Sequence, residues 1–241
     1  MTTQIERRAL ITGASSGIGR ATALAFAHSG IHVALVSRNQ TKLQEVANAA
    51  ADCGVNAQAY ATDLSDVHRV RDTIGAIAHD FGPIDILVNN AGIGYTGTLR
   101  DTPLTDWQRV LDLNLTSVFQ CIQAVLPGMR QRQQGTIINV VSIAGHQIFP
   151  DWGAYCVSKF GVVALSKTLA AEERAHGIRV TSISPGSVNT SIWDTDTVHA
   201  DFERSRMLTP DLVAQSILYA ALLPEQAVVE ELILMSNAGT F

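Results

Sequence analysis

The sequence predicts an α/β protein, a single domain with a Rossmann-like, doubly wound parallel sheet and helices on both faces. Short apolar runs alternate with longer segments of helical period, which is the pattern of strand–helix–strand units. The runs are apolar throughout, as in "HVALV" (32–36), and such strands lie in parallel sheets covered on both faces. Right-handed crossovers between them produce the doubly wound arrangement.

The predicted elements follow one another without an internal repeat or a linker. We predict strands at 8–12, 32–36, 56–62, 85–90, 135–142, 178–184 and 232–235. We predict helices at 18–29, 40–53, 65–81, 105–131, 152–176 and 210–222. The alternation weakens only between Gly186 and Thr209, and an irregular segment of this length commonly covers a site. The sequence therefore predicts one domain over residues 1–241, with a substrate flap at about 187–208.

Charge and composition limit the classes of partner. The 241 residues carry a net charge of −5 and no basic run, which argues against a nucleic-acid binder. The first apolar run (9–11) leaves no room before it for a secretory signal, and no apolar run approaches the ~20 residues of a membrane span. The three cysteines are widely spaced, as reduced thiols are. We expect a cytoplasmic protein with no nucleic-acid or membrane partner.

A glycine-rich turn follows the first strand and opens the first helix. In "ITGASSGIGRA" (11–21), Gly13, Gly17 and Gly19 allow a tight turn and close approach of the backbone to a diphosphate at the helix N-terminus. The spacing differs from the commonest dinucleotide fingerprint, and a glycine-rich turn alone also fits a plain strand–helix connection. Its position after the first strand favours dinucleotide binding.

The end of the second strand bears on the choice of cofactor. A NAD-binding unit carries an acidic residue there for the ribose 2′-hydroxyl, whereas this chain has Ser37 followed by Arg38. A guanidinium can bind a 2′-phosphate in a bidentate way, so we predict NADP(H) in preference to NAD(H); the alternative for Arg38 is a solvated surface side chain. Asp63 could accept a bond from an adenine amino group or could cap the next helix.

The stretch "AYCVSKFG" (154–161) places Tyr155 and Lys159 four residues apart. Residues i and i+4 share a face of a helix. A free phenol has a pKa of about 10, and a nearby cation favours the phenolate, so Lys159 is expected to lower the pKa of Tyr155 toward neutrality. Tyr155 would then act as a general acid in carbonyl reduction and as a general base in alcohol oxidation.

Five motifs in order carry a family resemblance: "TGASSGIG" (12–19), "NNAG" (89–92), "SIAG" (142–145), "YCVSK" (155–159) and "PGSVNT" (185–190). Over essentially its full length the chain resembles the short-chain dehydrogenases/reductases. The resemblance implies an NAD(P)-binding catalytic domain that interconverts a carbonyl and an alcohol by hydride transfer. It implies that Ser142 polarises the substrate oxygen and that Asn114, within "LDLNLTS", joins Lys159 to water in a proton relay.

The predicted catalytic residues are Asn114, Ser142, Tyr155 and Lys159. The predicted cofactor-binding residues are Gly13, Ser15, Ser16, Gly17, Ile18, Gly19, Ser37, Arg38, Asp63, Leu64, Asn90, Ala91, Gly92, Tyr155, Lys159, Pro185, Gly186, Val188 and Thr190. The alternatives for the last two are core packing for Val188 and a helix cap for Thr190. No metal is predicted, because the seven histidines are scattered and lack ligand spacing.

The predicted substrate pocket is apolar and aromatic, as small-molecule sites usually are. Its predicted lining is Gly94, Tyr95, Ser142, Ile148, Trp152 and Trp193, with Phe149 beside them. We expect a ketone, an aldehyde or a 3-oxo compound with an apolar body.

Two alternatives remain at this point. One is a 3-oxoacyl-[acyl-carrier-protein] reductase, for which Arg130 and Arg132 could grip an acidic carrier, although Ala171 and the ending "LILMSNAGTF" depart from that subset's pattern. The other is a regulator that binds NADPH without turning it over. The resemblance also implies a homotetramer, or a homodimer, formed through the long helices at 105–131 and 152–176.

Overall fold

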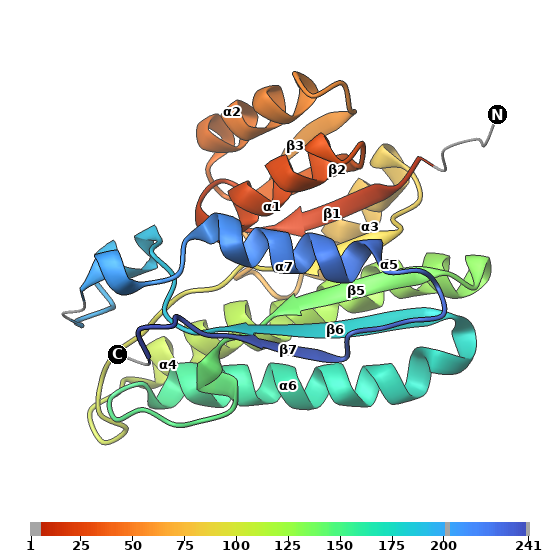
Figure 1. The fold of residues 1–241 in the computed structure, drawn as a ribbon. Helices are drawn as coiled ribbons and strands as arrows, with labels where there is room; N and C mark the ends of the chain where they lie inside the picture. Colours follow the sequence, from red (N-terminus) through yellow and green to blue (C-terminus); the bar gives the residue numbers. More distant parts are fainter. Residues whose placement is uncertain (1–5, 201–202, 240–241) are drawn as a thin grey trace.

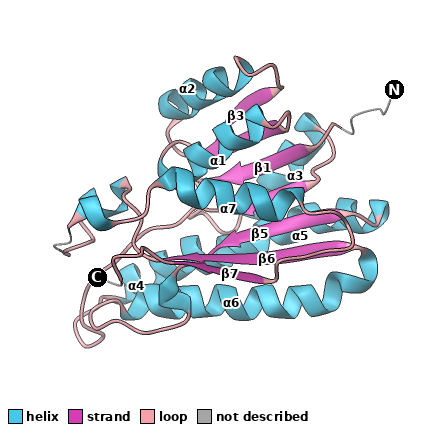
Figure 2. Ribbon diagram, viewed as in Figure 1, coloured by secondary structure: helices cyan, strands magenta, loops and turns pink. Residues whose placement is uncertain are grey.

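The computed structural model describes residues 6–200 and 203–239. Its centre is one parallel sheet of seven strands in the order β3-β2-β1-β4-β5-β6-β7, enclosed between helices (Figures 1 and 2). The strands are β1 (Arg8–Thr12), β2 (His32–Ser37), β3 (Ala57–Ala61), β4 (Ile86–Asn89), β5 (Gly135–Val140), β6 (Ile178–Pro185) and β7 (Glu231–Leu234). The predicted parallel, doubly wound sheet is confirmed.

The strand order reverses beside β1. The chain runs outward from β1 to β2 and β3, then returns to pair β4 with the other side of β1. The two connections leave the carboxyl ends of β1 and β4 in opposite directions, and a crevice opens between them. Ligands of open α/β sheets bind at such a reversal.

Helices cover both faces of the sheet. They are α1 (Gly17–His28), α2 (Gln40–Ala51), α3 (Val70–Phe81), α4 (Leu104–Leu111), α5 (Ser117–Arg132), α6 (Gly153–Glu173) and α7 (Pro210–Leu222). Alternate residues of each strand face opposite layers: Ile11 packs in the cluster with α1, α2 and α7, whereas its neighbour Leu10 packs in the cluster with α3, α5 and α6. This two-sided burial explains why the strands are apolar throughout.

Two predicted helices differ from the structure. Helix α3 begins at Val70 rather than at residue 65, because the Asp63 carboxylate accepts hydrogen bonds from the backbone N–H and hydroxyl of Ser65 and holds a turn. The helix predicted at 105–131 is continuous over Leu104–Arg132, but a π-helical turn, η1 (Asp112–Thr116), separates α4 from α5. Such insertions are frequent at functional sites.

The helical run Leu104–Arg132 is long and apolar enough to cross a membrane by length and composition, which the sequence did not lead us to expect. In the fold, 44% of its most apolar window is buried. Val118, Ile122 and Val125 of this run lie in the core beside β4 and β5. One side of the run therefore packs in the core of the fold.

Short 3-10 turns complete the chain: η2 (Ile143–Gly145), η3 (Arg174–His176), η4 (Ser191–Asp194) and η5 (Arg204–Arg206). Two of them lie in the segment between β6 and α7. A bridge between Val188 and Leu208 closes the base of this segment, so that residues 189–200 and 203–207 lie beyond the carboxyl edge of the sheet.

Candidate active site

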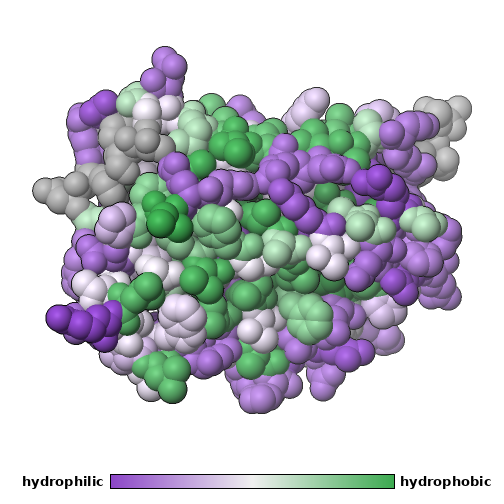
Figure 3. Space-filling model, turned by 90° about the horizontal axis from the view of Figure 1, so that it is seen from below, coloured by the Kyte–Doolittle hydropathy of each residue, from purple (hydrophilic) through white to green (hydrophobic). Residues whose placement is uncertain are grey.

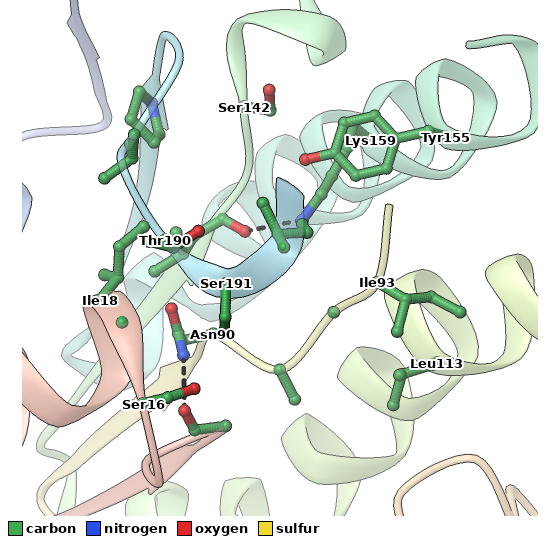
Figure 4. Close-up of a pocket in the computed structure, with 18 of the residues that line it drawn as sticks. Ser16, Ile18, Asn90, Ile93, Leu113, Ser142, Tyr155, Lys159, Thr190 and Ser191 are labelled. Atoms are coloured by element: carbon green, nitrogen blue, oxygen red, sulfur yellow. Dashed lines mark hydrogen bonds between the residues drawn. The ribbon is translucent and has the colours of Figure 1, made fainter. Parts of the chain in front are cut away.

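A groove of about 390 Å³ runs along the carboxyl edge of the sheet. Segments that follow all of β1 to β6 contribute to its wall, and the loop between β6 and α7 covers part of it. The glycine-rich turn lies at one end and Tyr155 at the other (Figure 4). Because the carboxyl ends of parallel strands meet at one edge, motifs far apart in sequence meet in this groove.

The glycine-rich turn forms a tight cradle at the N-terminus of α1. Gly13 and Gly17 have φ values of +66° and +52°, which favour glycine. A Cβ atom on Gly13 would lie 2.8 Å from Nδ2 of Asn90, and this amide in turn donates to the carbonyl of Thr12 at 3.0 Å. The first N–H groups of a helix have no partner within it, so the turn suits the diphosphate of a dinucleotide.

The ends of β2 and β3 form the adjoining wall. The hydroxyl of Ser37 is 2.7 Å from that of Ser15, which ties β2 to the glycine-rich turn, and Arg38 is exposed at the groove. Burial acts to raise the pKa of Asp63, but hydrogen bonds from Ser65 and the positive charges of Arg38 and Arg109 lower it overall. No carboxylate follows Ser37 at the end of β2 to repel a 2′-phosphate.

Tyr155 and Lys159 project from α6 into the same end of the groove, near Ser142 (Figure 4). The Lys159 ammonium lies 5.7 Å from the centre of the Tyr155 ring and donates to the carbonyl of Val140 at 3.1 Å. Ser142 lies between β5 and η2, and its hydroxyl oxygen accepts a hydrogen bond from the N–H of Ala144 at 3.1 Å. That bond orients the serine so that its own proton points to an oxygen in the groove, which in the protein by itself is that of Tyr155.

Burial, not the lysine, dominates the ionisation of this pair. Desolvation raises the pKa of Tyr155 to about 12, and the hydrogen bond from Ser142 offsets only part of this. Desolvation likewise lowers the pKa of Lys159 to about 8. The expected lowering of the Tyr155 pKa by Lys159 is therefore wrong for the protein by itself, because both groups lose water when the fold forms.

Asn114 lies behind the pair, on the π-helical turn. It is fully buried; its Oδ1 accepts from the N–H of Ile93 at 2.8 Å, and its Nδ2 donates to the carbonyl of Ile93 at 2.9 Å and to the hydroxyl of Ser158 at 3.2 Å. The extra residue of a π-turn changes the direction in which the side chains of that turn point. Asn114 thus fixes the loop after β4 and does not itself line the groove.

The end of the groove that holds Tyr155 has two tryptophans. Trp152 packs edge-on against Tyr155, with ring centres 5.4 Å apart, and against Trp193, with ring centres 5.8 Å apart. Trp193 belongs to η4, and its indole N–H donates to the carbonyl of Val188 at 2.7 Å. Phe149 and Ile192 extend this apolar wall.

Three residues predicted at the substrate lie outside the groove. Gly94 faces the covering loop, where Thr197 Oγ1 donates to its carbonyl at 2.9 Å. The ring of Tyr95 folds back over Gly97, and Ile148 is 80% exposed. In the glycine-rich turn, Gly19 packs on Gly13 beneath the surface of the groove.

Most of the other predicted site residues do line the groove. Residues that the sequence did not single out also line it: Thr62, Ile93, Leu113, Val140, Val141, Ile143, Ala144, Ser187, Ser191, Ile192 and Thr195. Many of these adjoin a motif residue, so proximity in sequence could have found them. Ser191 and Ile192 of η4 belong to no motif, although they lie in the segment predicted as a substrate flap, and Trp193 beside them was predicted at the substrate.

Arg130 and Arg132 lie far from the groove. They end α5, immediately before β5 begins, and therefore stand at the amino edge of the parallel sheet. Arg130 pairs with the buried carboxylate of Glu173, and Arg132 donates to the carbonyl of Ile84. Neither position suits a grip on a carrier at the mouth of the groove.

Among residues 6–200 and 203–239, no group of three or more His, Cys, Asp or Glu side chains could hold a metal ion. The groove offers backbone amides, hydroxyls and aromatic rings, together with the ammonium of Lys159, the guanidinium of Arg38 and the carboxylate of Asp63.

The comparison with known proteins agrees with this geometry. A family model described as short chain dehydrogenase matches residues 7–200. The D-threitol dehydrogenase of Mycolicibacterium smegmatis is 38% identical over 221 residues, with 88% of this chain and 85% of that protein covered. The glycine betaine reductase of Emericella nidulans is 34% identical over 232 residues, which are 94% of this chain but only 18% of that protein.

A solved metagenomic short-chain oxidoreductase in complex with NADP is 30% identical, with a TM-score of 0.84 and coverage of 96% of this chain and 97% of that one. The likeness therefore extends from the motifs to the whole fold. The chain belongs to the short-chain dehydrogenase/reductase family.

Proposed function

We propose that the protein is an NADP(H)-dependent oxidoreductase that interconverts a carbonyl compound and an alcohol, with Tyr155 as general acid and base. The observation that carries the proposal is the convergence of Tyr155, Ser142 and Lys159 at one end of the groove that begins at the glycine-rich turn. A nicotinamide dinucleotide, when bound along this groove, supplies or accepts the hydride at the substrate carbon.

Each side chain has a role in the proton half of the reaction. In reduction, the Tyr155 hydroxyl gives its proton to the carbonyl oxygen as negative charge develops there. The Ser142 proton stabilises the same oxygen. Lys159, charged at neutral pH because its pKa is about 8, favours the phenolate that forms. Oxidation of the alcohol uses the same groups in reverse.

Asn114 acts in this scheme through the loop that it holds. Its side chain fixes both backbone groups of Ile93, next to Gly92, whose Cα would carry a Cβ 3.8 Å from the Lys159 ammonium. Gly92 therefore lies between Asn114 and Lys159, since the same Cβ would lie 3.2 Å from Asn114 Oδ1, and this proximity supports a role for Asn114 in placing water near Lys159, as the family resemblance implies.

NADP(H) rather than NAD(H) is proposed from the end of β2. Arg38 stands exposed at the groove, and Ser37 holds a hydroxyl where a carboxylate would repel a 2′-phosphate. The NADP bound to the solved metagenomic relative supports this choice. The remaining groove residues predicted for the cofactor would hold its diphosphate, riboses and carboxamide.

The substrate is proposed to be a small carbonyl compound or alcohol with an apolar body, because Trp152, Trp193 and Phe149 form the wall beyond Tyr155. The positions of Arg130 and Arg132 at the opposite edge of the sheet count against a carrier-linked 3-oxoacyl substrate. We also propose that each chain is one catalytic domain with a substrate flap at about 187–208. The chains are proposed to form a homo-oligomer in the cytoplasm.

The test is Tyr155→Phe, assayed for NADPH oxidation over ketones, aldehydes, quinones and 3-oxoacyl thioesters. The substitution removes the transferable proton, and we expect turnover to fall by about 10²- to 10⁴-fold while NADPH binding in calorimetry stays near that of the unsubstituted protein. Turnover that survives in a folded Tyr155→Phe variant would refute the assignment. NADPH that binds but reacts with no carbonyl, in the unsubstituted protein, would favour a regulator.

A further inference from the structure

One arginine binds three residues of the segment that covers the groove. Arg204, in η5, donates from Nε to Oδ1 of Asn189 at 2.8 Å, from Nη1 to Oδ1 of Asp194 at 2.9 Å, and from Nη2 to the carbonyl of Thr190 at 2.9 Å. Its three nitrogens thus bind three residues of the arm that leaves β6. The planar fork of arginine suits such simultaneous contacts.

The arm that Arg204 holds is the arm that lines the groove. Thr190, Ser191, Ile192 and Trp193 all face it. The methyl carbon of Thr190 would lie 3.1 Å from a Cβ on Gly17, so this arm passes directly over the glycine-rich turn. Two ends of the groove, the diphosphate cradle and the tryptophan wall, therefore depend on the position of one short segment.

Other contacts also hold this arm: the Trp193 indole donates to the Val188 carbonyl and packs against Trp152, and further bonds lie at the base and tip of the covering loop. At the base, Asn189 N–H donates to the Leu208 carbonyl at 2.9 Å. At the tip, Thr96 N–H donates to the Thr197 carbonyl at 2.8 Å. The bond from Arg204 to the Thr190 carbonyl joins the arm that leaves β6 to the part of the covering loop that leads into α7.

We infer that Arg204 is a positioning residue, which sets the affinity for cofactor and substrate by holding the Asn189–Asp194 arm closed over the groove. The inference rests on the proposed function. Arg204 does not line the groove and acts only through the arm. Its side chain is 36% exposed and that of Asp194 is 62% exposed, so the ion pair itself adds little to folding stability, and the geometric effect on binding dominates.

The test is Arg204→Ala, with Arg174→Ala as the matched control, since Arg174 also forms an exposed ion pair, with Glu230, near the start of β6. We expect the Kd for NADPH, measured by calorimetry, to rise about tenfold, which corresponds to loss of roughly one net hydrogen bond. The KM for the carbonyl should rise similarly while kcat changes less than about threefold, because Ser142, Tyr155 and Lys159 lie on other elements. Arg174→Ala should match the unsubstituted protein.

Two further variants distinguish positioning from folding. Arg204→Lys keeps the charge but gathers its donors on one nitrogen in place of the planar fork, and Asn189→Ala removes one acceptor; both should raise the Kd for NADPH about threefold. An unchanged Kd and KM in Arg204→Ala, even with a lower Tm, would overturn the inference, as would an unchanged Kd in both milder variants if Arg204→Ala does not fold. Turnover that survives in Tyr155→Phe would instead refute the proposed function without altering the calorimetric result.

Discussion

Lys159 carries a positive charge in a place where water is scarce. It is 5% exposed, and burial lowers its pKa from 10.5 to about 8, whereas the pKa of Tyr155 is raised to about 12. Between these values Lys159 loses its charge while Tyr155 keeps its proton. The lysine, not the tyrosine, is therefore the group that titrates near working pH in the protein by itself.

A pH profile tests this. We expect kcat/KM for carbonyl reduction to fall as pH rises through about 8, since the phenolate that forms on Tyr155 then lacks its cation. Steady-state rates between about pH 6 and 10 would measure it, and Lys159→Met should give a low, flat profile. A rate that stays level to about pH 10 in the unsubstituted protein would contradict the assignment.

The same pKa shift makes stability depend on pH. The folded pKa of Lys159 lies below the unfolded one, so the unfolded chain binds more protons between about pH 8 and 10.5. The contribution of Lys159 to the free energy of unfolding therefore rises with pH across this window and is lost as pH falls through about 8. Urea unfolding of the protein and of Lys159→Met should diverge by about 3 kcal/mol across it, from roughly 1.4 kcal/mol per pKa unit.

Arg38 decides the cofactor preference in our proposal. Arg38→Asp replaces a cation at the groove by a charge that repels a 2′-phosphate, and we expect the NADPH-to-NADH ratio of kcat/KM to fall at least tenfold. Arg71→Asp, an exposed position of α3 outside the groove, makes the same charge change and should leave the ratio unaltered. A native preference for NADH would show the cofactor prediction to be wrong.

At this scale the sequence was informative where a motif fixed both residue type and spacing. Gly13, Tyr155 and Lys159, which it singled out, line the groove. It failed for Gly94, Tyr95 and Ile148, because orientation of a loop side chain depends on which distant segment packs against it. It also missed the direction of the Tyr155 pKa, because burial cannot be read from a neighbour four residues away.

At the scale of elements, the covering loop fits the 94–97 loop closely. A Cβ on Gly94 would lie 2.6 Å from Cγ2 of Val198, and Val198 is buried. Gly94→Ala should therefore displace the tip of the loop and raise the KM for the carbonyl about three- to tenfold, with a loss of stability of about 1–3 kcal/mol from overpacking.

Kinetics and urea unfolding would measure both effects. Gly75→Ala supplies the control, because a Cβ there meets nothing within 4 Å and alanine favours a helix over glycine. Equal KM values for Gly94→Ala and the unsubstituted protein would mean that the loop tip is free to move without affecting binding.

Periodicity predicted all the α-helices and β-strands of the described chain, but it predicted α4 and α5 as one helix without the π-helical turn between them. The bounds were right to within a few residues where a glycine, proline or polar cap marked them, as at Pro210. The start of α3 was missed because the Asp63 turn resembles a helix cap in sequence. The π-turn at Asn114 was missed because one added residue leaves the apolar pattern nearly unchanged.

At the scale of the whole molecule, one face carries a broad apolar patch among polar residues. Figure 3 shows hydrophobic side chains gathered across the face seen from below, and exposed residues of α5 and α6 include Phe119, Val157 and Phe160. A monomer seldom exposes such a face without a partner. It coincides with the long helices through which we expect a homotetramer or homodimer.

Sedimentation velocity tests that expectation. Phe160→Glu places a charge on this face and should lower the association constant at least tenfold, with smaller species at micromolar protein. Gln44→Glu, on exposed α2, adds the same charge elsewhere and should sediment as the unsubstituted protein does. A monomer before any substitution would refute the assembly.

The contact between Trp152 and Trp193 joins a fixed helix start to the covering arm. Two indoles this close couple electronically, so their near-ultraviolet circular dichroism and their emission depend on mutual orientation. The third tryptophan, Trp107, lies on α4 and not on the covering arm. A change in tryptophan spectra when the arm moves would therefore come from the Trp152–Trp193 pair. The position of the covering arm can therefore be followed by tryptophan fluorescence or near-ultraviolet circular dichroism without an added dye.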